Sequence, residues 1–473
     1  MTLWATDAMR AAMQARVEGA LPDAVAGLSI DSRTIRPGEA FFALSDVRDG
    51  HDFVEAALKA GAALAVVAED RRRKLPKDAP LLVVCDVLEG LRDLARAARL
   101  RSAAKIVAVT GSVGKTSTKE ALRLVLSREG PTHASAASYN NHWGVPLSLA
   151  RCPQEARFAV FEIGMNHAGE IEPLSRLVRP HVAVVTTVEP VHLEYFRSVA
   201  AIADAKAEIF AGLEPGGAVI LNRDNDQYAR LKSLAERAGV GRVVSFGSAA
   251  GADARLVNYA LQPGGSTVRA EIFGHEIAYK LGAPGLHLVM NSLAVLAAAS
   301  LVGADLALTA LALAEFEPAP GRGTRTRLTL PSGEALLIDE SYNANPASMR
   351  AALALLGQTP VGARGRRIAV LGDMLELGEE AGPMHRDLAG PVLDNRIDLV
   401  FCSGPAMHKL WEALPSERRG GYAEDSQRLE PLVLESVRGG DAIMVKGSNG
   451  SRMGPIVKAL QRVFAGRGEL EGA

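Results

Sequence analysis

The chain has 473 residues, 48% hydrophobic and 23% charged, which is the composition of a folded protein of about three domains and excludes a disordered chain. Its formal net charge of −1 gives no reason to expect capture by nucleic acid or an anionic membrane, so we expect a small-molecule substrate. Cys85, Cys152 and Cys402 lie far apart without CxxC spacing, which argues against a disulfide framework or zinc site and predicts buried thiols in a reducing, cytoplasmic setting.

We expect no targeting or membrane segment. The N-terminal stretch MTLWATDAMRAAM lacks a basic region followed by an apolar core, so it does not resemble a secretion signal. The apolar run over residues 286–314 is interrupted by Asn291, Ser292 and Asp305, which leaves no uncharged stretch of about 20 residues to cross a bilayer. The run therefore predicts a buried helix or helix pair.

Residues 1–102 mix short strand-like runs with helical stretches, which predicts a small α/β domain. The runs AFFAL, ALAVVA and PLLVVCDV are apolar and short, and FVEAALKAGA has helical composition. The stretch DSRTIRPGEAFFAL predicts two short strands joined by a turn at Pro37 and Gly38, because proline fixes φ and glycine tolerates positive φ.

Residues 103–319 contain apolar strands that each end in a polar loop. The runs KIVAVT, FAVFEIG, HVAVVTTV and GAVILN are too apolar to be half-exposed, and helical patterns separate them. We therefore predict a central parallel sheet covered on both faces. Such sheets bind ligands at the carboxyl ends of their strands.

Residues 320–473 repeat this rhythm after the glycine-rich PGRG linker. Strand-like runs in ALLIDESYNANP, RIAVLGDMLELG, DLVFCSG and DAIMVKGSNG each lead into a polar loop and a helix. This pattern predicts a Rossmann-like third domain. No GxGxxG follows any of its strands, so we do not expect a dinucleotide ligand.

The segment AVTGSVGKTSTKE at the start of the middle domain predicts a phosphate-binding loop. Backbone N–H groups of a glycine loop at a helix N-terminus can surround phosphate oxygens, a lysine can neutralise them, and a hydroxyl can hold Mg²⁺. The glycine spacing is shorter than in the usual pattern, and no NKxD sequence supports a guanine nucleotide. The predicted nucleotide-binding residues of this loop are Thr110, Gly111, Ser112, Val113, Gly114, Lys115, Thr116 and Ser117.

Further oxygen ligands for Mg²⁺ should come from neighbouring strand ends. Glu162 closes the run RFAVFE, where an unpaired carboxylate would be costly to bury, and this favours a functional role. His192 follows the next strand, although a loop histidine is more often a surface or packing residue. Lys206 lies in a helical stretch, where most lysines are solvated.

Taken together, the motifs of the chain resemble the ATP-dependent Mur ligases of bacterial cell-wall synthesis. Their order resembles the branch that joins D-alanyl-D-alanine to UDP-N-acetylmuramoyl-tripeptide (UDP-MurNAc-tripeptide), and the shortened glycine loop is the superfamily's form. The motifs that carry the resemblance are TGSVGKTSTKE, FEIGMNHAGE, EPVHLEYF, IADAKAEIF, GLHLVMNSLA, PGRGTR, DESYNANPASM, LGDMLELG and VKGSNGSRM.

The resemblance implies a role for each catalytic residue of the middle domain. Lys115 would contact the β and γ phosphates of ATP, and Thr116 and Glu162 would hold one Mg²⁺. His192 would help to hold a second Mg²⁺. Lys206 would carry a carbamate formed with CO₂, which would turn a repelling cation into a carboxylate ligand of that second ion.

The resemblance also implies contacts for the rest of the nucleotide and for both substrates. His287 and Asn291 would pack against the base, Arg322 would reach the γ-phosphate, and Asp339 and Tyr342 would complete the ribose and adenine site. The predicted substrate-binding residues are Asp31, Ser32, Arg33, Asp49, His51, Asn140, Asn141, Asn343, Asn345, Lys446 and Ser448. Two departures from the family are Ser45 to Arg48 in place of a glycine-containing turn, and Ala137-Ser138 where many relatives have Gly-Asn.

The implied fold is a small N-terminal α/β UDP-binding domain, a central P-loop parallel-sheet domain and a C-terminal Rossmann-like domain. The implied reaction is acyl activation by ATP followed by amide formation, in a monomer whose domains close about hinges near residues 100–105 and 319–324. The third residue of the tripeptide, lysine or diaminopimelate, stays open. So do two alternatives: another ligase of the superfamily, including folate or cyanophycin-type enzymes, and a P-loop switch that ligates nothing.

Overall fold

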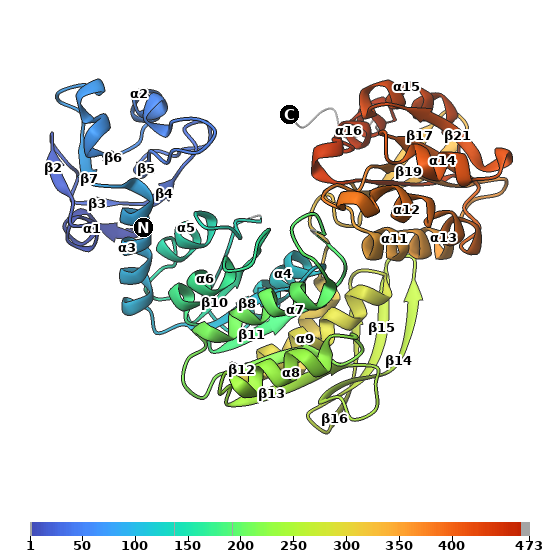
Figure 1. The fold of residues 1–473 in the computed structure, drawn as a ribbon, viewed down its shortest axis with the longest axis horizontal. Coiled ribbons are helices and arrows are strands. Elements are labelled where there is room, and N and C mark those ends of the chain that lie inside the picture. Colours follow the sequence, from blue (N-terminus) through green and yellow to red (C-terminus); the bar gives the residue numbers. More distant parts are fainter. Residues whose placement is uncertain (1, 137, 192, 465–473) are drawn as a thin grey trace.

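The computed structural model describes residues 2–136, 138–191 and 193–464, which form three lobes in chain order (Figure 1). The blue N-terminal lobe and the orange and red C-terminal lobe lie on either side of the green and yellow middle lobe. Each lobe contains a sheet and flanking helices, so the predicted three-part α/β fold is confirmed. The predicted domain limits at residues 102 and 319 fall in connections outside helices and strands, and they stay predictions.

The N-terminal lobe is built on a five-stranded sheet in the order β2-β7-β6-β5-β4, which is parallel except for the antiparallel β2·β7 pair. A two-stranded ribbon, β1·β3, lies beside it. The strands are β1 (Trp4–Ala5), β2 (Arg16–Glu18), β3 (Ala24–Val25), β4 (Gly27–Ser29), β5 (Glu39–Phe42), β6 (Leu64–Ala68) and β7 (Leu81–Val84). The helices are α1 (Thr6–Met13), η1 (Gly50–Phe53), α2 (Val54–Lys59), η2 (Glu69–Lys74) and α3 (Val87–Arg101).

The predicted strand over the DSRT stretch is wrong. Strand β4 ends at Ser29, and the chain then turns, because the Asp31 carboxylate accepts a hydrogen bond from the backbone N–H of Arg33 at 2.9 Å. Such a local side-chain bond competes with strand pairing. The second predicted strand is confirmed as β5.

The middle lobe has a nine-stranded sheet in the order β16-β15-β14-β13-β12-β11-β8-β10-β9. Its strands are β8 (Lys105–Thr110), β9 (Thr132–Ala134), β10 (Phe158–Glu162), β11 (Val182–Val185), β12 (Ala218–Asn222), β13 (Arg242–Gly247), β14 (Ala254–Gln262), β15 (Gly265–Ile272) and β16 (His275–Leu281). Its helices are α4 (Lys115–Ser127), α5 (Gly144–Ala150), α6 (Ile171–Val178), α7 (Val199–Ala207), η3 (Glu208–Gly212), α8 (Tyr228–Arg237), α9 (Leu286–Leu301), α10 (Leu306–Ala312) and η4 (Leu313–Glu315).

The predicted parallel sheet is confirmed for β8 to β13, but the sheet continues as an antiparallel extension that the sequence did not predict. Strands β14, β15 and β16 pair antiparallel with one another. Burial alternates along β15, so this part of the sheet is covered on one face only. Helices α9 and α10 confirm the predicted helix pair over residues 286–314.

The C-terminal lobe has a six-stranded sheet in the order β17-β18-β22-β19-β20-β21, parallel except for the β17·β18 hairpin. Its strands are β17 (Thr324–Leu330), β18 (Gly333–Glu340), β19 (Arg367–Gly372), β20 (Leu399–Ser403), β21 (Arg419–Ala423) and β22 (Ala442–Lys446). Its helices are α11 (Pro346–Gln358), η5 (Gly378–Glu380), α12 (Ala381–Arg386), α13 (Ala389–Asp394), α14 (His408–Ala413), η6 (Ser416–Arg418), α15 (Ser426–Ser436), η7 (Asn449–Ser451) and α16 (Gly454–Val463).

The first two lobes share a hydrophobic core. One buried cluster runs from Trp4 and Leu94 in the N-terminal lobe to Val145 and Phe161 in the middle lobe. The two buried clusters of the C-terminal lobe contain residues of that lobe alone. The C-terminal lobe is therefore packed as a separate unit.

The structure bears on the predictions about membrane-spanning helices and about the three cysteines. Within the described residues, no helix is both long enough and apolar enough to cross a membrane. Cys152 and Cys402 are buried as predicted, but Cys85 is exposed, because it lies in the connection between β7 and α3. The prediction of a buried thiol at Cys85 is wrong.

Candidate active site

A cavity of about 670 Å³ lies between the middle and C-terminal lobes. The glycine loop before α4, the loops after β10 and β11, and the start of α9 form its middle-lobe wall. The linker at Gly321 and Arg322 and the ends of β18 and β22 form the opposite wall. The cavity therefore gathers the carboxyl ends of strands from two sheets, where parallel sheets bind ligands.

The glycine loop between β8 and α4 has a backbone that requires glycine at two positions. Gly111 has φ +144° and Gly114 has φ +86°, in the region that favours glycine. A Cβ at Gly111 would lie 1.9 Å from Thr186 Oγ1, and one at Gly114 would lie 2.5 Å from Asn291 Nδ2. Both positions therefore exclude a side chain.

Lys115 begins α4, and its ammonium folds back over the loop. Its Nζ donates a hydrogen bond to Gly111 O at 2.7 Å. Burial lowers the pKa of the Lys115 ammonium, whereas the nearby Glu162 carboxylate opposes that shift. A phosphate in the loop would compete with the carbonyl for this donor and would compensate the charge more fully.

The remaining loop residues are held in place by the loops after β11. Ser112 Oγ donates to Glu189 O at 3.2 Å, and Thr186 Oγ1 donates to Val113 O at 2.5 Å. Thr110 is buried at the end of β8. Ser112, Val113 and Ser117 also line the cavity.

Two buried residues, Thr116 and Glu162, and the half-buried Asn140 form a polar group next to the loop. Thr116 Oγ1 donates to Glu162 Oε2 at 2.8 Å, and Asn140 Nδ2 donates to Glu162 Oε1 at 2.7 Å. Hydrogen bonds thus hold both carboxylate oxygens in place. Asn141 lies beside them, where its Oδ1 accepts a bond from the N–H of Gly144 at the start of α5.

Lys206 is not a solvated helix lysine. It lies on α7 with 2% of its surface exposed, and within the described residues no hydrogen bond or ion pair reaches its Nζ. Burial lowers the pKa of Lys206 well below its ordinary value, and the charge of Lys115 lowers it further. His192, the other predicted ligand of this region, lies outside the described residues.

Helix α9 carries His287 and Asn291 on the wall of the cavity, and their predicted contacts with the nucleotide base stay predictions. The Asn291 amide packs on Gly114, and His287 lines the same cavity. Burial lowers the pKa of His287, so its ring is neutral near pH 7. A neutral ring and an amide suit a nucleotide base better than a phosphate.

The linker between the lobes brings Arg322 over the cavity. Its guanidinium lies 4.1 Å from the centre of the Tyr342 ring and donates to Ser138 Oγ at 3.4 Å. Asp339 Oδ2 accepts a bond from the N–H of Gly321 at 3.1 Å, which ties the linker to β18. Asp339 Oδ1 accepts bonds from both the N–H and the hydroxyl of Ser341.

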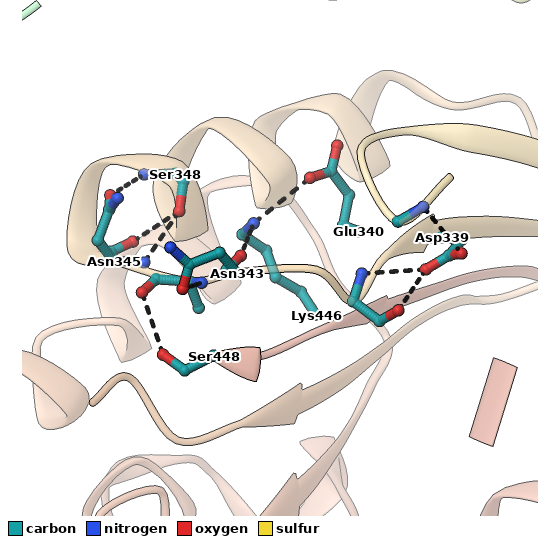
Figure 2. Close-up of polar contacts among 10 residues, drawn as sticks. Asp339, Glu340, Asn343, Asn345, Ser348, Lys446 and Ser448 are labelled. Atoms are coloured by element: carbon teal, nitrogen blue, oxygen red, sulfur yellow. Dashed lines mark hydrogen bonds and ion pairs between the residues drawn. The ribbon is translucent and has the colours of Figure 1, made fainter. Parts of the chain in front are cut away.

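Figure 2 shows the predicted substrate-binding residues of the C-terminal lobe around Lys446 at the end of β22. Lys446 Nζ donates to Asn343 O at 2.9 Å and lies 3.4 Å from Glu340 Oε2. Asn345 caps α11, since its Oδ1 accepts from the N–H of Ser348. Ser448 Oγ donates to Ala344 O and accepts from the N–H of Leu375. Asn345 and Ser448 therefore hold the loops that line the cavity.

The predicted residues of the N-terminal lobe lie outside this cavity. Asp31 pairs with the Arg33 side chain at 2.7 Å, and Ser32 lies between them in the turn. His51 is buried: its Nδ1 donates to Asp49 Oδ1 at 2.6 Å and its Nε2 accepts from the N–H of Ala68 at 2.9 Å. His51 thus orders its loop with both ring nitrogens.

A second cavity, of about 920 Å³, lies between α3 and α6. It shares wall residues with the first cavity at Asn141, Gly164, Asn166 and Glu170. The two cavities therefore meet at the loop after β10. A substrate longer than either cavity could occupy both.

Sequence reasoning missed three carboxylates at or near the site. Glu189 and Glu340 line the cavity. Glu208 caps α6, accepting bonds from the backbone N–H groups of Gly169 at 2.6 Å and Ile171 at 3.0 Å. The sequence shows Glu208 two residues after Lys206, but it does not show that this carboxylate contacts α6.

The donor set fits a magnesium site completed by phosphate oxygens. The described residues contain no group of three or more His, Cys, Asp or Glu side chains that could hold a metal alone. The Thr116 hydroxyl and Glu162 carboxylate are oxygen donors 2.8 Å apart beside the phosphate loop. Mg²⁺ commonly takes one or two protein oxygens and fills its other positions with substrate phosphates and water.

Three family models match the chain and together span most of it. They are "Mur ligase family, catalytic domain" at residues 24–105, "Mur ligase middle domain" at 109–299, and "Mur ligase, glutamate ligase domain" at 325–449.

Relatives named UDP-N-acetylmuramoyl-tripeptide--D-alanyl-D-alanine ligase are similar over nearly the whole chain. The Escherichia coli protein is 36% identical over 92% of this chain and 93% of its own length. The Rickettsia prowazekii protein is 30% identical over 92% of this chain and 95% of its own.

Two solved structures share the fold over most of the chain. MurF from Acinetobacter baumannii has a TM-score of 0.83 at 29% identity and covers 97% of this chain and 99% of its own. The MurF ligase from Thermotoga maritima, solved in complex with ADP, has a TM-score of 0.75 at 26% identity. That comparison covers 92% of this chain and 97% of the Thermotoga chain.

Proposed function

Because the chain belongs to the Mur ligase family, we propose that it joins D-alanyl-D-alanine to UDP-MurNAc-tripeptide with cleavage of ATP to ADP and phosphate. The observation that carries the proposal is the cavity in which the glycine loop and Lys115 face Arg322 and Lys446 of the linker and C-terminal lobe. A ligase that activates an acid with ATP needs such a two-sided site, because phosphate donor and amine acceptor must meet.

The reaction consists of two displacements. A carboxylate oxygen of the tripeptide attacks the γ-phosphorus of ATP, the bond to the β-phosphate oxygen breaks, and ADP leaves. The amine of D-alanyl-D-alanine then attacks the acyl carbon, inorganic phosphate leaves, and the nitrogen gives up its protons until it is a neutral amide. Lys115 and Arg322 reduce the repulsion between carboxylate and triphosphate.

Thr116 and Glu162 would hold Mg²⁺, which supplies positive charge to the phosphate oxygens when bound. The hydrogen bond from Asn140 keeps the Glu162 carboxylate oriented toward that position. A carbamate at Lys206 would form when CO₂ adds to the neutral amine with loss of one proton. The buried Nζ, which has no partner within the described residues, supports this modification.

The shared wall of the two cavities supports a path for the donor substrate. We place the tripeptide end at Asn140 and Asn141, beside Glu162, and the sugar and diphosphate toward the second cavity. The uridine contacts of Asp31, Arg33 and Asp49, the monomeric state and the cytoplasmic location belong to the proposal as predictions.

The test is product formation followed by mass spectrometry. Purified protein, Mg²⁺, ATP, UDP-MurNAc-tripeptide and D-alanyl-D-alanine are combined, and each component is omitted in turn. We expect a UDP-linked pentapeptide that requires every component, with either lysine or diaminopimelate in the tripeptide. Folded, ATP-binding protein that makes no pentapeptide from either tripeptide would overturn the proposal.

A further inference from the structure

Lys446 is a buried cation on the C-terminal wall of the cavity, and its place in the sheet fixes it there. It ends β22, which lies between β18 and β19, and only 2% of its surface is exposed. A lysine side chain is costly to order and to desolvate, and burial lowers the pKa of this ammonium. A buried ammonium that still lines a cavity is therefore a candidate for binding an anion.

Within the described residues, Lys446 forms an ion pair with Glu340 and a hydrogen bond with Asn343, and these two partners use two of the three donors of its ammonium. Asn343 O accepts one hydrogen bond at 2.9 Å, but the Glu340 carboxylate lies 3.4 Å away, at the long end of hydrogen-bonding distance. Figure 2 shows Glu340, the last residue of β18, and Asn343, on the loop that follows it, beside Lys446. An ammonium has three donors, so a further acceptor can bind from the cavity.

The other cations of the cavity already have a use in the proposed reaction. The lysine and arginine residues of the described cavity wall are Lys115, Arg322 and Lys446. Lys115 lies in the phosphate loop, and Arg322 lies on the linker above Ser138. Lys446 lies on the C-terminal lobe at the end of β22, outside the phosphate loop and the linker, so it is the cation of this wall to which the proposed reaction has not yet given a role.

We propose that Lys446 binds the terminal carboxylate of the dipeptide acceptor and selects acceptors that carry that charge. This inference rests on the proposed function, since it names the contact of one substrate of that reaction. The dipeptide is a zwitterion whose amine must reach the acyl phosphate. Its carboxylate is then held about two residues away, roughly 7 Å in an extended chain. The loop of Asn343 and Ala344, which leads into α11, lies against Lys446 and Ser448 and supports the same wall.

The test compares D-alanyl-D-alanine with its C-terminal amide as acceptors. With wild-type protein, we expect kcat/KM for the acid to exceed that for the amide by about 10- to 100-fold, as expected for a lost charged hydrogen bond. In Lys446→Met, which keeps most of the length of the side chain without its charge, the two acceptors should become equal within about threefold. KM for ATP should change little.

The control variant is Lys458→Met, which removes an exposed lysine of α16 in the same lobe. It should keep the preference of wild-type protein for the acid. If Lys446→Met does not fold, the double variant Glu340→Gln, Lys446→Met removes both charges of the pair, and the same acid-to-amide ratio is measured.

Each outcome decides the proposal. A preference for the acid that survives in the Lys446 variants would overturn it, and so would equal losses for both acceptors together with a raised KM for ATP, which would assign Lys446 to the nucleotide. Wild-type protein that ligates neither acceptor would instead overturn the proposed function itself.

Discussion

At the scale of single residues, Lys206 differs most from what its sequence context predicts, because a lysine in a helix is usually exposed to solvent. Its amine is buried beside Lys115, so an unmodified ammonium there is opposed both by desolvation and by a like charge. Its pKa is lowered well below the ordinary value, so neutral amine is present near pH 7 and increases as the pH rises. Neutral amine is the form that adds CO₂.

We therefore predict that Lys206→Met abolishes ligation without destabilising the protein. Methionine fills a similar volume and removes the cost of burying an amine, so the free energy of unfolding should stay equal or rise. Urea denaturation measures the stability. With ¹³C-bicarbonate, wild-type protein should show an additional carbonyl resonance in NMR spectra that weakens on acidification and is missing from Lys206→Met. A variant as active as wild-type protein, or an identical spectrum from both, would contradict the carbamate.

At the scale of elements, the glycine loop was predictable because its requirements lie within eight consecutive residues. The positive φ values of Gly111 and Gly114 and the helix that starts at Lys115 follow from local sequence. Lys446 is buried because β22 lies in the middle of its sheet, between β18 and β19. The order of the strands within a sheet cannot be read from the individual strand sequences. The capping role of Asn345 was equally hidden, because an Asn before a Pro also fits a loop that contacts substrate.

The cap of α6 is another contact that the sequence does not reveal, and its contribution can be tested. The Glu208 carboxylate accepts hydrogen bonds from three backbone N–H groups at the start of α6, those of Gly169, Ile171 and Glu172. The residue that precedes the helix in sequence, Glu170, makes no such capping bond with its side chain. This carboxylate joins α6 to the end of α7, where Lys206 lies. It thereby fixes the loop after β10 that separates the two cavities.

We predict that Glu208→Ala lowers the free energy of unfolding by about 1–2 kcal/mol, because it leaves the helix N-terminus without its acceptor and its favourable charge. Chemical denaturation measures the loss. The matched control is Glu236→Ala on α8, an exposed carboxylate whose nearest partner lies at 3.9 Å, and its effect should stay within about 0.5 kcal/mol. Equal effects of the two substitutions would show that the cap contributes nothing special.

At the scale of the whole molecule, the two predicted hinges have different surroundings. Between the first two lobes, Arg99 donates to Val178 O and Glu214, Trp4 donates to Ala150 O, and a buried core is shared. Across the second junction, Arg322 reaches Ser138 at 3.4 Å, and the C-terminal lobe has cores of its own. Closure about residues 319–324 thus breaks fewer buried contacts than closure about residues 100–105.

We accordingly predict that the C-terminal lobe moves on ligand binding while the first two lobes move as one body. Cys85 is exposed and the other two cysteines are buried, so a spin label can be placed on the native thiol. A second label on Lys232→Cys reports the middle lobe, and one on Lys458→Cys reports the C-terminal lobe. With Mg²⁺ and a non-hydrolysable ATP analogue, the distance from Cys85 to position 458 should shorten, and the distance to position 232 should stay constant. A change of similar size in both distances would mean that the shared core opens at the first junction, and the buried contacts of Arg99 and Trp4 would then be too weak to hold the two lobes together.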